Sequence, residues 1–107
     1  MVTPELMASW ARTEALLLEA NSALPVEATT RFSPQLETFK QFLSHNELGL
    51  ALDTLIDLVE ELQVATVPVI RPLLMAAENM GLTKERAALA ELLESLDPRT
   101  SNMSAPE

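Results

Sequence analysis

The stretch that decides the fold runs from Phe39 to Leu62 and reads FKQFLSHNELGLALDTLIDLVEEL. It predicts the end of one helix, a tight polar corner at Ser44-His45-Asn46, and a second helix from Glu47 to about Leu62. At about 100° per residue, one broad face of the second helix collects most of its large apolar side chains; these are Leu48, Leu52, Leu55, Val59 and Leu62, with Ala51 and Leu58 beside them. We expect Asn46 to cap this helix, because its side-chain oxygen can accept a hydrogen bond from a free amide in the first turn.

The opposite face of the same helix is acidic. Asp53, Asp57, Glu60 and Glu61 gather there, and no Lys or Arg is interleaved with them. The pairs Asp53/Asp57 and Asp57/Glu61 are like charges at a four-residue spacing, which mildly destabilises a helix. Leu50 projects among these charges, where an apolar residue suits an interface better than open water. Two explanations stay open: the face serves solubility alone, or it attracts a basic protein partner.

Outside this stretch, the apolar spacing predicts helices over residues 4–20, 34–44, 70–80 and 84–96, in addition to 47–62. Thr3-Pro4 and Ser33-Pro34 each combine a capping residue with a proline that suits a first helical turn. The first helix presents one apolar face, on which core packing of the tryptophan is favoured over an exposed anchor; this face consists of Leu6, Trp10, Thr13, Leu17 and Ala20.

Two segments interrupt the helical pattern. Residues 21–33 predict a connection with at most one loose turn. Between Gln63 and Arg71, strand-forming residues are interrupted by Pro68 and Pro72, which cannot donate to a sheet ladder. We therefore expect the next helix to begin near Val69 or Ile70, with Pro72 in its first turn.

The predicted fold class is all-α: a compact bundle of about five short helices without a sheet. The sequence contains one tryptophan and three phenylalanines and no tyrosine, so its core must consist mainly of aliphatic side chains. We expect a single helical domain over residues 1–98. Residues 99–107 have almost nothing to bury and are expected to be a disordered tail.

The composition argues against several classes of function. The 107 residues include 16 acidic and 7 basic ones, which gives a formal net charge of −9. This charge argues against binding nucleic acid or an anionic membrane, because both require basic patches. The absence of cysteine excludes disulfides and thiolate chemistry. The pattern shows neither a signal peptide nor a membrane-spanning stretch, and we expect a cytoplasmic protein.

The central stretch also carries a resemblance to a known family. An apolar helix ending in Phe42-Leu43 is followed by the polar corner and then by Asn46-Glu47-x-Gly49-Leu50-Ala51-Leu52-Asp53-x-Leu55-x-Asp57. This pattern resembles the MafI-type family of bacterial toxin-immunity proteins, over roughly Gln35 to Leu82 if the helix ending Asn79-Met80-Gly81-Leu82 is included. The resemblance implies a protein that neutralises a cognate toxin by direct association. It does not identify the toxin.

Catalytic and metal chemistry are not expected. His45 is the single histidine, and we interpret it as a solvated corner residue or as part of a helix-end hydrogen bond. Asp53, Asp57 and Glu61 have the spacing of helical metal ligands, but no histidine joins them, so we interpret them as a solvated acidic face. Neither glycine belongs to a phosphate-binding loop. The sequence therefore predicts no catalytic residue, no cofactor and no metal.

Gly49 deserves separate interpretation because glycine in a helical turn costs about 0.5–1 kcal/mol relative to alanine. A close approach of the preceding helix is the favoured explanation, and space for a partner is the other. We therefore assign a second candidate binding surface to the corner, consisting of His45, Asn46, Glu47 and Gly49, after the first one formed by Leu50, Asp53, Asp57, Glu60 and Glu61.

The leading hypothesis is thus an immunity protein that binds a basic toxin domain, which a toxin acting on nucleic acid would present. The alternative is a structural or adaptor domain that self-associates, for example as a homodimer, or docks into a larger assembly. An enzyme is the least favoured class.

Overall fold

The structure is a computed structural model that describes residues 2–62 and 65–96. Within these ranges the chain forms six helices and no strand, which confirms the all-α prediction; the helices are α1 (Pro4–Ser22), α2 (Val26–Arg31), α3 (Ser33–Ser44), α4 (Leu48–Leu62), α5 (Val67–Met80) and α6 (Thr83–Leu96). The tail predicted over 99–107 lies outside the described residues.

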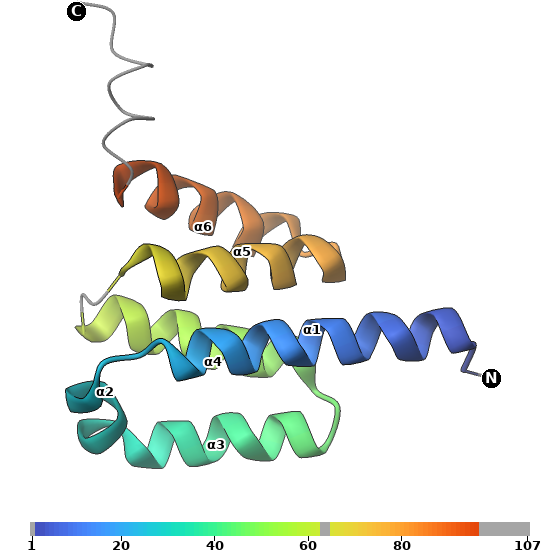
Figure 1. Ribbon diagram of the computed structural model, residues 1–107, viewed down its shortest axis with the longest axis horizontal. Helices are drawn as coiled ribbons and strands as arrows, with labels where there is room; N and C mark the ends of the chain where they lie inside the picture. Colours follow the sequence, from blue (N-terminus) through green and yellow to red (C-terminus); the bar gives the residue numbers. More distant parts are fainter. Residues whose placement is uncertain (1, 63–64, 97–107) are drawn as a thin grey trace, which may run out of the picture.

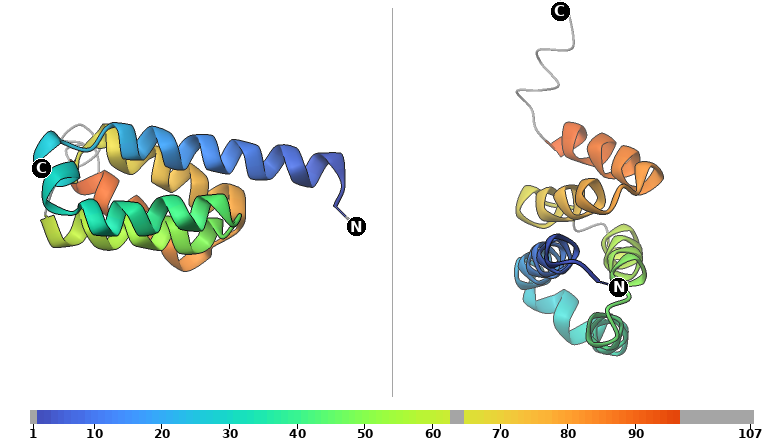
Figure 2. Two further views of the ribbon diagram at one scale, coloured as in Figure 1. Left: turned by 90° about the horizontal axis from the view of Figure 1, so that it is seen from below. Right: turned by 90° about the vertical axis from the view of Figure 1, so that its right-hand side faces the viewer.

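The helices are stacked in layers. Seen from the end, α6 lies on α5, α5 lies on the pair formed by α1 and α4, and α3 lies beneath that pair beside α2 (Figure 2). The most extensive contacts join α1 to α5, α5 to α6, and α3 to α4. The chain therefore contains two hairpins of consecutive helices, α3–α4 and α5–α6, and α1 packs against α5, which is far from it in the sequence (Figure 1).

The core is aliphatic, as the composition predicted. The predicted apolar face of α4 is buried in all its described members, including Leu52, Leu55 and Val59. Side chains from every helix complete one continuous cluster; those with no accessible surface include Leu17, Phe39, Ile70, Leu73 and Leu89.

Both hairpin corners use a residue in the left-handed region. Asn46 has φ 57° and Gly81 has φ 72°. At the first corner the Glu47 amide donates to the Phe42 carbonyl at 2.8 Å, and at the second the Leu82 amide donates to the Ala77 carbonyl at 3.0 Å. Such bonds satisfy carbonyls at a helix end. The expectation that Asn46 caps α4 is wrong: the residue ends α3, because asparagine tolerates this backbone conformation better than most side chains do.

The start of α5 also differs from the prediction. The helix begins at Val67, so that Pro68 occupies its first turn and Pro72 lies inside it. The amides of Val69 and Ile70 both donate to the Thr66 carbonyl, at 3.1 and 2.8 Å, and the helix starts two or three residues earlier than expected. Pro68 has no amide to satisfy, and this position suits a proline equally well.

The connection predicted over residues 21–33 contains more structure than a loose turn. Pro25 precedes the six-residue helix α2. Ala28 and Phe32 are buried from this segment, and the Arg31 guanidinium lies over the Phe32 ring at 5.5 Å from its centroid. The burial of these two apolar side chains fixes a helix that is too short to be stable alone.

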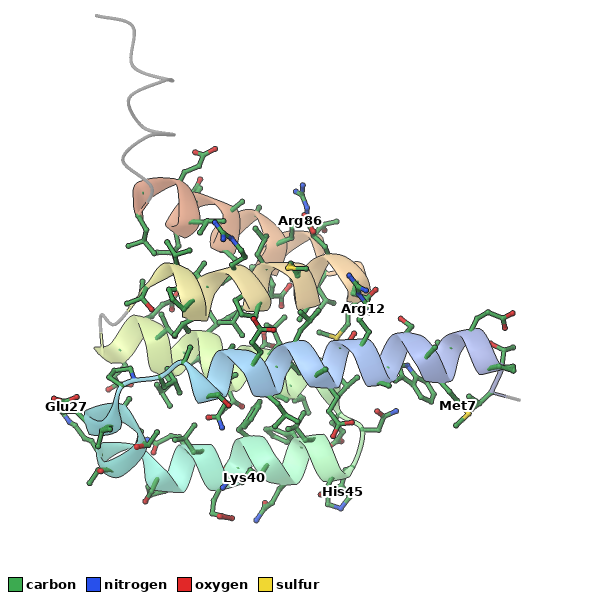
Figure 3. All side chains as sticks on the ribbon, viewed as in Figure 1. Met7, Arg12, Glu27, Lys40, His45 and Arg86 are labelled. Carbon is green, nitrogen blue, oxygen red and sulfur yellow. The ribbon has the colours of Figure 1, made fainter. Side chains whose placement is uncertain are left out.

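The first turns of α1 extend past the end of the other helices (Figure 2, left). Thr3 caps this end as predicted, with its hydroxyl accepting from the Leu6 amide at 3.0 Å. Leu6 and Met7 remain 42% and 59% exposed, and Met7 points away from the bundle (Figure 3). We call residues 2–8, which are all exposed, the overhang. The predicted core face of α1 is therefore buried at Thr13, Leu17 and Ala20 and uncovered at Leu6.

Candidate functional site

Three of the predicted acidic residues meet α6 along a shared hollow. Asp53, Asp57 and Glu60 of α4 line a groove of about 470 Å³ together with Ile56 on the same helix and Lys84, Glu85 and Ala88 of α6. We call it the acidic groove. It has two apolar residues among its walls and four carboxylates against one ammonium. The sequence had suggested that no cation lies among the acids of α4. The structure places Lys84, from α6, beside them.

Several charges of the acidic groove act on the carboxyl group of Asp53. Partial burial raises the pKa of its carboxyl, and the charge of Glu85, a hydrogen bond with Glu85 and the charge of Asp57 raise that pKa further. Lys84 acts in the opposite direction without cancelling these effects. The groove therefore holds more negative charge than its own cation neutralises, and a cationic partner would relieve the excess.

The other two residues of the first predicted surface are exposed on α4 but do not line the acidic groove. Leu50 is 48% exposed and does not join the core, as expected. Glu61 is also exposed, beside Glu60 in the chain. The structure thus brings three of the five predicted residues to one groove and leaves two beside it.

A second hollow lies where both hairpin corners meet α1. It has a volume of about 390 Å³, and we call it the end cleft; its lining residues are Leu6, Ser9, Trp10 and Thr13 of α1, Asn46, Leu48 and Gly49 around the first corner, and Asn79, Met80 and Leu82 around the second. Trp10 is half-buried against the core while also lining this cleft. The expected choice between core packing and an exposed anchor is therefore not exclusive.

Asn79 fixes α1 to α5 at the inner side of the end cleft. Its side-chain amide donates to the Thr13 hydroxyl at 2.7 Å and lies 3.1 Å from the Ser9 carbonyl oxygen and 3.2 Å from the Ser9 hydroxyl oxygen. Thr13 is almost completely buried, so this bond satisfies a hydroxyl that burial would otherwise penalise. The overhang ends at the residue before Ser9, the first residue of this attachment.

Gly49 opens onto the end cleft. A Cβ atom at this position would have one near neighbour from another part of the structure, the Leu82 Cδ1 at 4.0 Å. The favoured expectation of a close approach by the preceding helix is wrong, because the polar corner carries α3 away before α4 begins. Its neighbour is the second hairpin, and the absent side chain leaves space in the cleft.

The remaining corner residues divide between structure and surface. The His45 ring is exposed and places Nδ1 2.9 Å from the Gln41 carbonyl oxygen, which agrees with both interpretations offered from the sequence, a solvated corner residue and a helix-end hydrogen bond. Glu47 is exposed, and its carbonyl accepts from the Ala51 amide at 3.0 Å in the first turn of α4. Of the four corner candidates, Asn46 and Gly49 line the end cleft.

Sequence reasoning missed the residues that come from other elements. Lys84 and Glu85 follow Thr83 at the start of α6, and nothing in their spacing pairs them with α4. Ser9 and Asn79 are ordinary polar residues until the fold places them together. The detectable signal was confined to α4 itself, whose acids share one face.

Within residues 2–62 and 65–96, no group of three or more His, Cys, Asp or Glu side chains is arranged to hold a metal ion. Over the same ranges, no helix combines the length and apolar character needed to cross a bilayer. Comparison of the chain with protein-family models, with curated proteins and with solved structures found no match.

Proposed function

We propose that this protein is an immunity-type binding protein, a small helical domain that neutralises a basic protein toxin by direct association. The observation that carries the proposal is the acidic groove, in which Asp53, Asp57, Glu60 and Glu85 face one Lys84. Burial, and then the neighbouring carboxylates of Glu85 and Asp57, raise the pKa of Asp53, so its ionised form opposes folding. A cationic surface of a partner would turn this unfavourable interaction into an attraction.

The resemblance of the central stretch to MafI-type immunity proteins agrees with this function and centres on the same helix. The formal net charge of −9 adds long-range attraction toward a basic protein. Exposed Leu50, about one turn before Asp53 on the same helix, offers apolar contact area. Together these features favour fast association with a basic surface, followed by contacts that slow its release.

The test uses the protein encoded by the neighbouring gene as the candidate toxin and measures association and dissociation rates at two salt concentrations. We expect association to slow markedly as salt rises, because electrostatic attraction is screened. Glu60→Lys should weaken binding roughly tenfold or more, since it puts a repulsive charge inside the groove. Co-expression should show the same order of protection against the toxin's effect on growth.

Glu61→Lys is the matched control, because it makes the same charge change one residue away and outside the groove. Equal losses of affinity for both variants would mean that the net charge of the protein, and not the acidic groove, causes the effect. Rates that respond neither to salt nor to either substitution would retire the acidic groove as the toxin-binding surface.

A second candidate function is a structural or adaptor domain that self-associates. Exposed Val2, Leu6 and Met7 on the overhang favour it, because an apolar surface of this kind can bury itself against a second copy. Sedimentation velocity over a hundredfold range of concentration decides between them: a dimer that Leu6→Lys dissociates supports the adaptor, and a monomer throughout removes it.

A further inference from the structure

The end cleft and the acidic groove follow one another along α4. Gly49 lines the cleft, and Asp53, one turn later, opens the groove. The second hairpin supplies the facing wall of both, since Leu82 lies beside Gly49 and Glu85 lies beside Asp53. From Gly49 to Glu60 the strip extends about 16 Å along the helix axis. One extended element of a partner could therefore occupy both hollows.

The two ends of this strip differ in chemistry. The end cleft is lined by apolar side chains such as Leu6, Trp10 and Met80, and none of its lining residues carries a charge. The overhang leaves Leu6 uncovered although it continues the buried stripe of α1. The acidic groove, by contrast, offers carboxylates on both walls. An occupant complementary to both would be apolar at one point and cationic further along.

A second copy of this chain does not match these requirements. Its overhang is apolar enough for the cleft, but residues 1–11 contain no Lys or Arg and one acid, Glu5. It would also bring another formal charge of −9 to a surface that is already acidic. Charge complementarity therefore favours a basic partner over self-association at this strip.

We propose that the end cleft and the acidic groove together bind one amphipathic helix of a basic partner protein. A bulky apolar residue of that helix enters the cleft between the overhang and Gly49. Lysine or arginine side chains about one, two and three turns away lie along the groove beside Asp53, Asp57 and Glu60, because both helices share the same rise per residue. This inference rests on the proposed function and names the element of the toxin that the protein would grip.

The first test uses a synthetic alanine-rich helical peptide with one phenylalanine anchor and three lysines placed one, two and three turns after it. Binding is measured by anisotropy of a dye on the peptide. Occupation of the cleft is followed by ¹⁹F NMR of protein labelled with 5-fluorotryptophan, which gives one signal because Trp10 is the single tryptophan in the sequence. We expect a shift of this signal on binding. A peptide with alanine at the anchor should bind at least tenfold more weakly and leave the signal in place.

Two matched pairs of variants test the end cleft and the acidic groove separately. Leu6→Lys should weaken the peptide at least tenfold, whereas Leu18→Lys should not, although these leucines are equally exposed on the same helix, at 42% and 43%. Glu60→Lys should weaken it at least tenfold and Glu61→Lys should not. All four side chains are exposed, so the folded state is expected to persist, and circular dichroism checks this.

Three results would overturn the inference: equal effects within either matched pair, binding without a change in the Trp10 signal, or a Trp10 signal that moves with protein concentration alone, as self-association would cause.

Repeating the ¹⁹F measurement with the toxin domain separates the two proposals. If Glu60→Lys weakens toxin binding but the toxin leaves the ¹⁹F signal of Trp10 unchanged, the proposed function stands. The proposal that one helix occupies both the end cleft and the acidic groove is then wrong. If the peptide occupies the strip and the toxin does not bind, the proposed function falls.

Discussion

In the C-terminal half of α1, Leu17 and Ala20 are completely buried against the neighbouring helices. Three turns earlier on the same stripe, Leu6 keeps 42% of its surface exposed. Composition and spacing do not distinguish these two halves, since both read as the inner face of an amphipathic helix. The difference arises from the arrangement of the partners: the first turns of α1 extend past the other helices (Figure 2). An apolar stripe thus indicates which face of a helix can be buried, and the arrangement of the other helices decides whether that face is buried.

The largest effect should separate these two halves directly. Leu17→Ala should lower the free energy of unfolding by about 2–5 kcal/mol, because it removes buried methyl groups and leaves a cavity. Leu6→Ala should change it by less than about 0.5 kcal/mol, as is usual for an exposed site. Urea denaturation followed by circular dichroism measures both. Similar losses would mean that the overhang is covered in solution.

The boundary between the halves depends on the amide of Asn79. Asn79→Ala should cost about 1–3 kcal/mol, because it leaves the buried Thr13 hydroxyl without its 2.7 Å donor. The neighbouring Glu78→Ala removes an exposed ion pair to Arg86 of 3.2 Å and should cost at most about 1 kcal/mol. Thermal unfolding compares them, and a larger loss for the Glu78 variant would contradict this assignment.

The two glycines should respond in opposite directions. Gly49→Ala should stabilise the protein by about 0.5–1 kcal/mol, because alanine favours a helix and the nearest atom, Leu82 Cδ1, leaves room at 4.0 Å. Gly81→Ala should destabilise it by about 1 kcal/mol, because φ is 72° there. The same denaturation experiment distinguishes them. If Gly49→Ala also weakens the peptide described above, the space beside the overhang serves binding.

The smallest effect should appear at Asp53, which is partly buried in the acidic groove, in contrast to the exposed overhang. The raised pKa of Asp53 destabilises the folded state above that pKa, and this penalty disappears as the pH falls below the ordinary aspartate value. Asp53→Asn should therefore raise the melting temperature slightly at pH 7 and lose this advantage below about pH 4. Melting curves from pH 3 to 8 measure it, with Glu61→Gln as the control outside the groove. An advantage that grows on acidification would reverse the sign of the argument.

The inner face of α4 could be predicted because its register is contained in one segment: Leu52, Leu55 and Val59 recur at helical spacing without a competing signal. The start of α5 could not, because Pro68 and Pro72 both suit a first turn and only tertiary packing selects between them. Three acids of the groove, Asp53, Asp57 and Glu60, were predicted from α4 alone. Its wall at Lys84 and Glu85 was not, because contacts between hairpins are not encoded in local spacing.

The packing of α1 on α5 has a consequence for the order of folding. Each hairpin joins neighbours in the sequence, so α3–α4 and α5–α6 can form after closing only short loops. The α1–α5 contact must enclose the whole first hairpin and requires the chain to be complete beyond Met80. Until then Leu17 and Ala20 have no α5 to cover them. Pulse-labelled hydrogen exchange should accordingly protect amides of both hairpins before those of α1, although α1 precedes both hairpins in the chain.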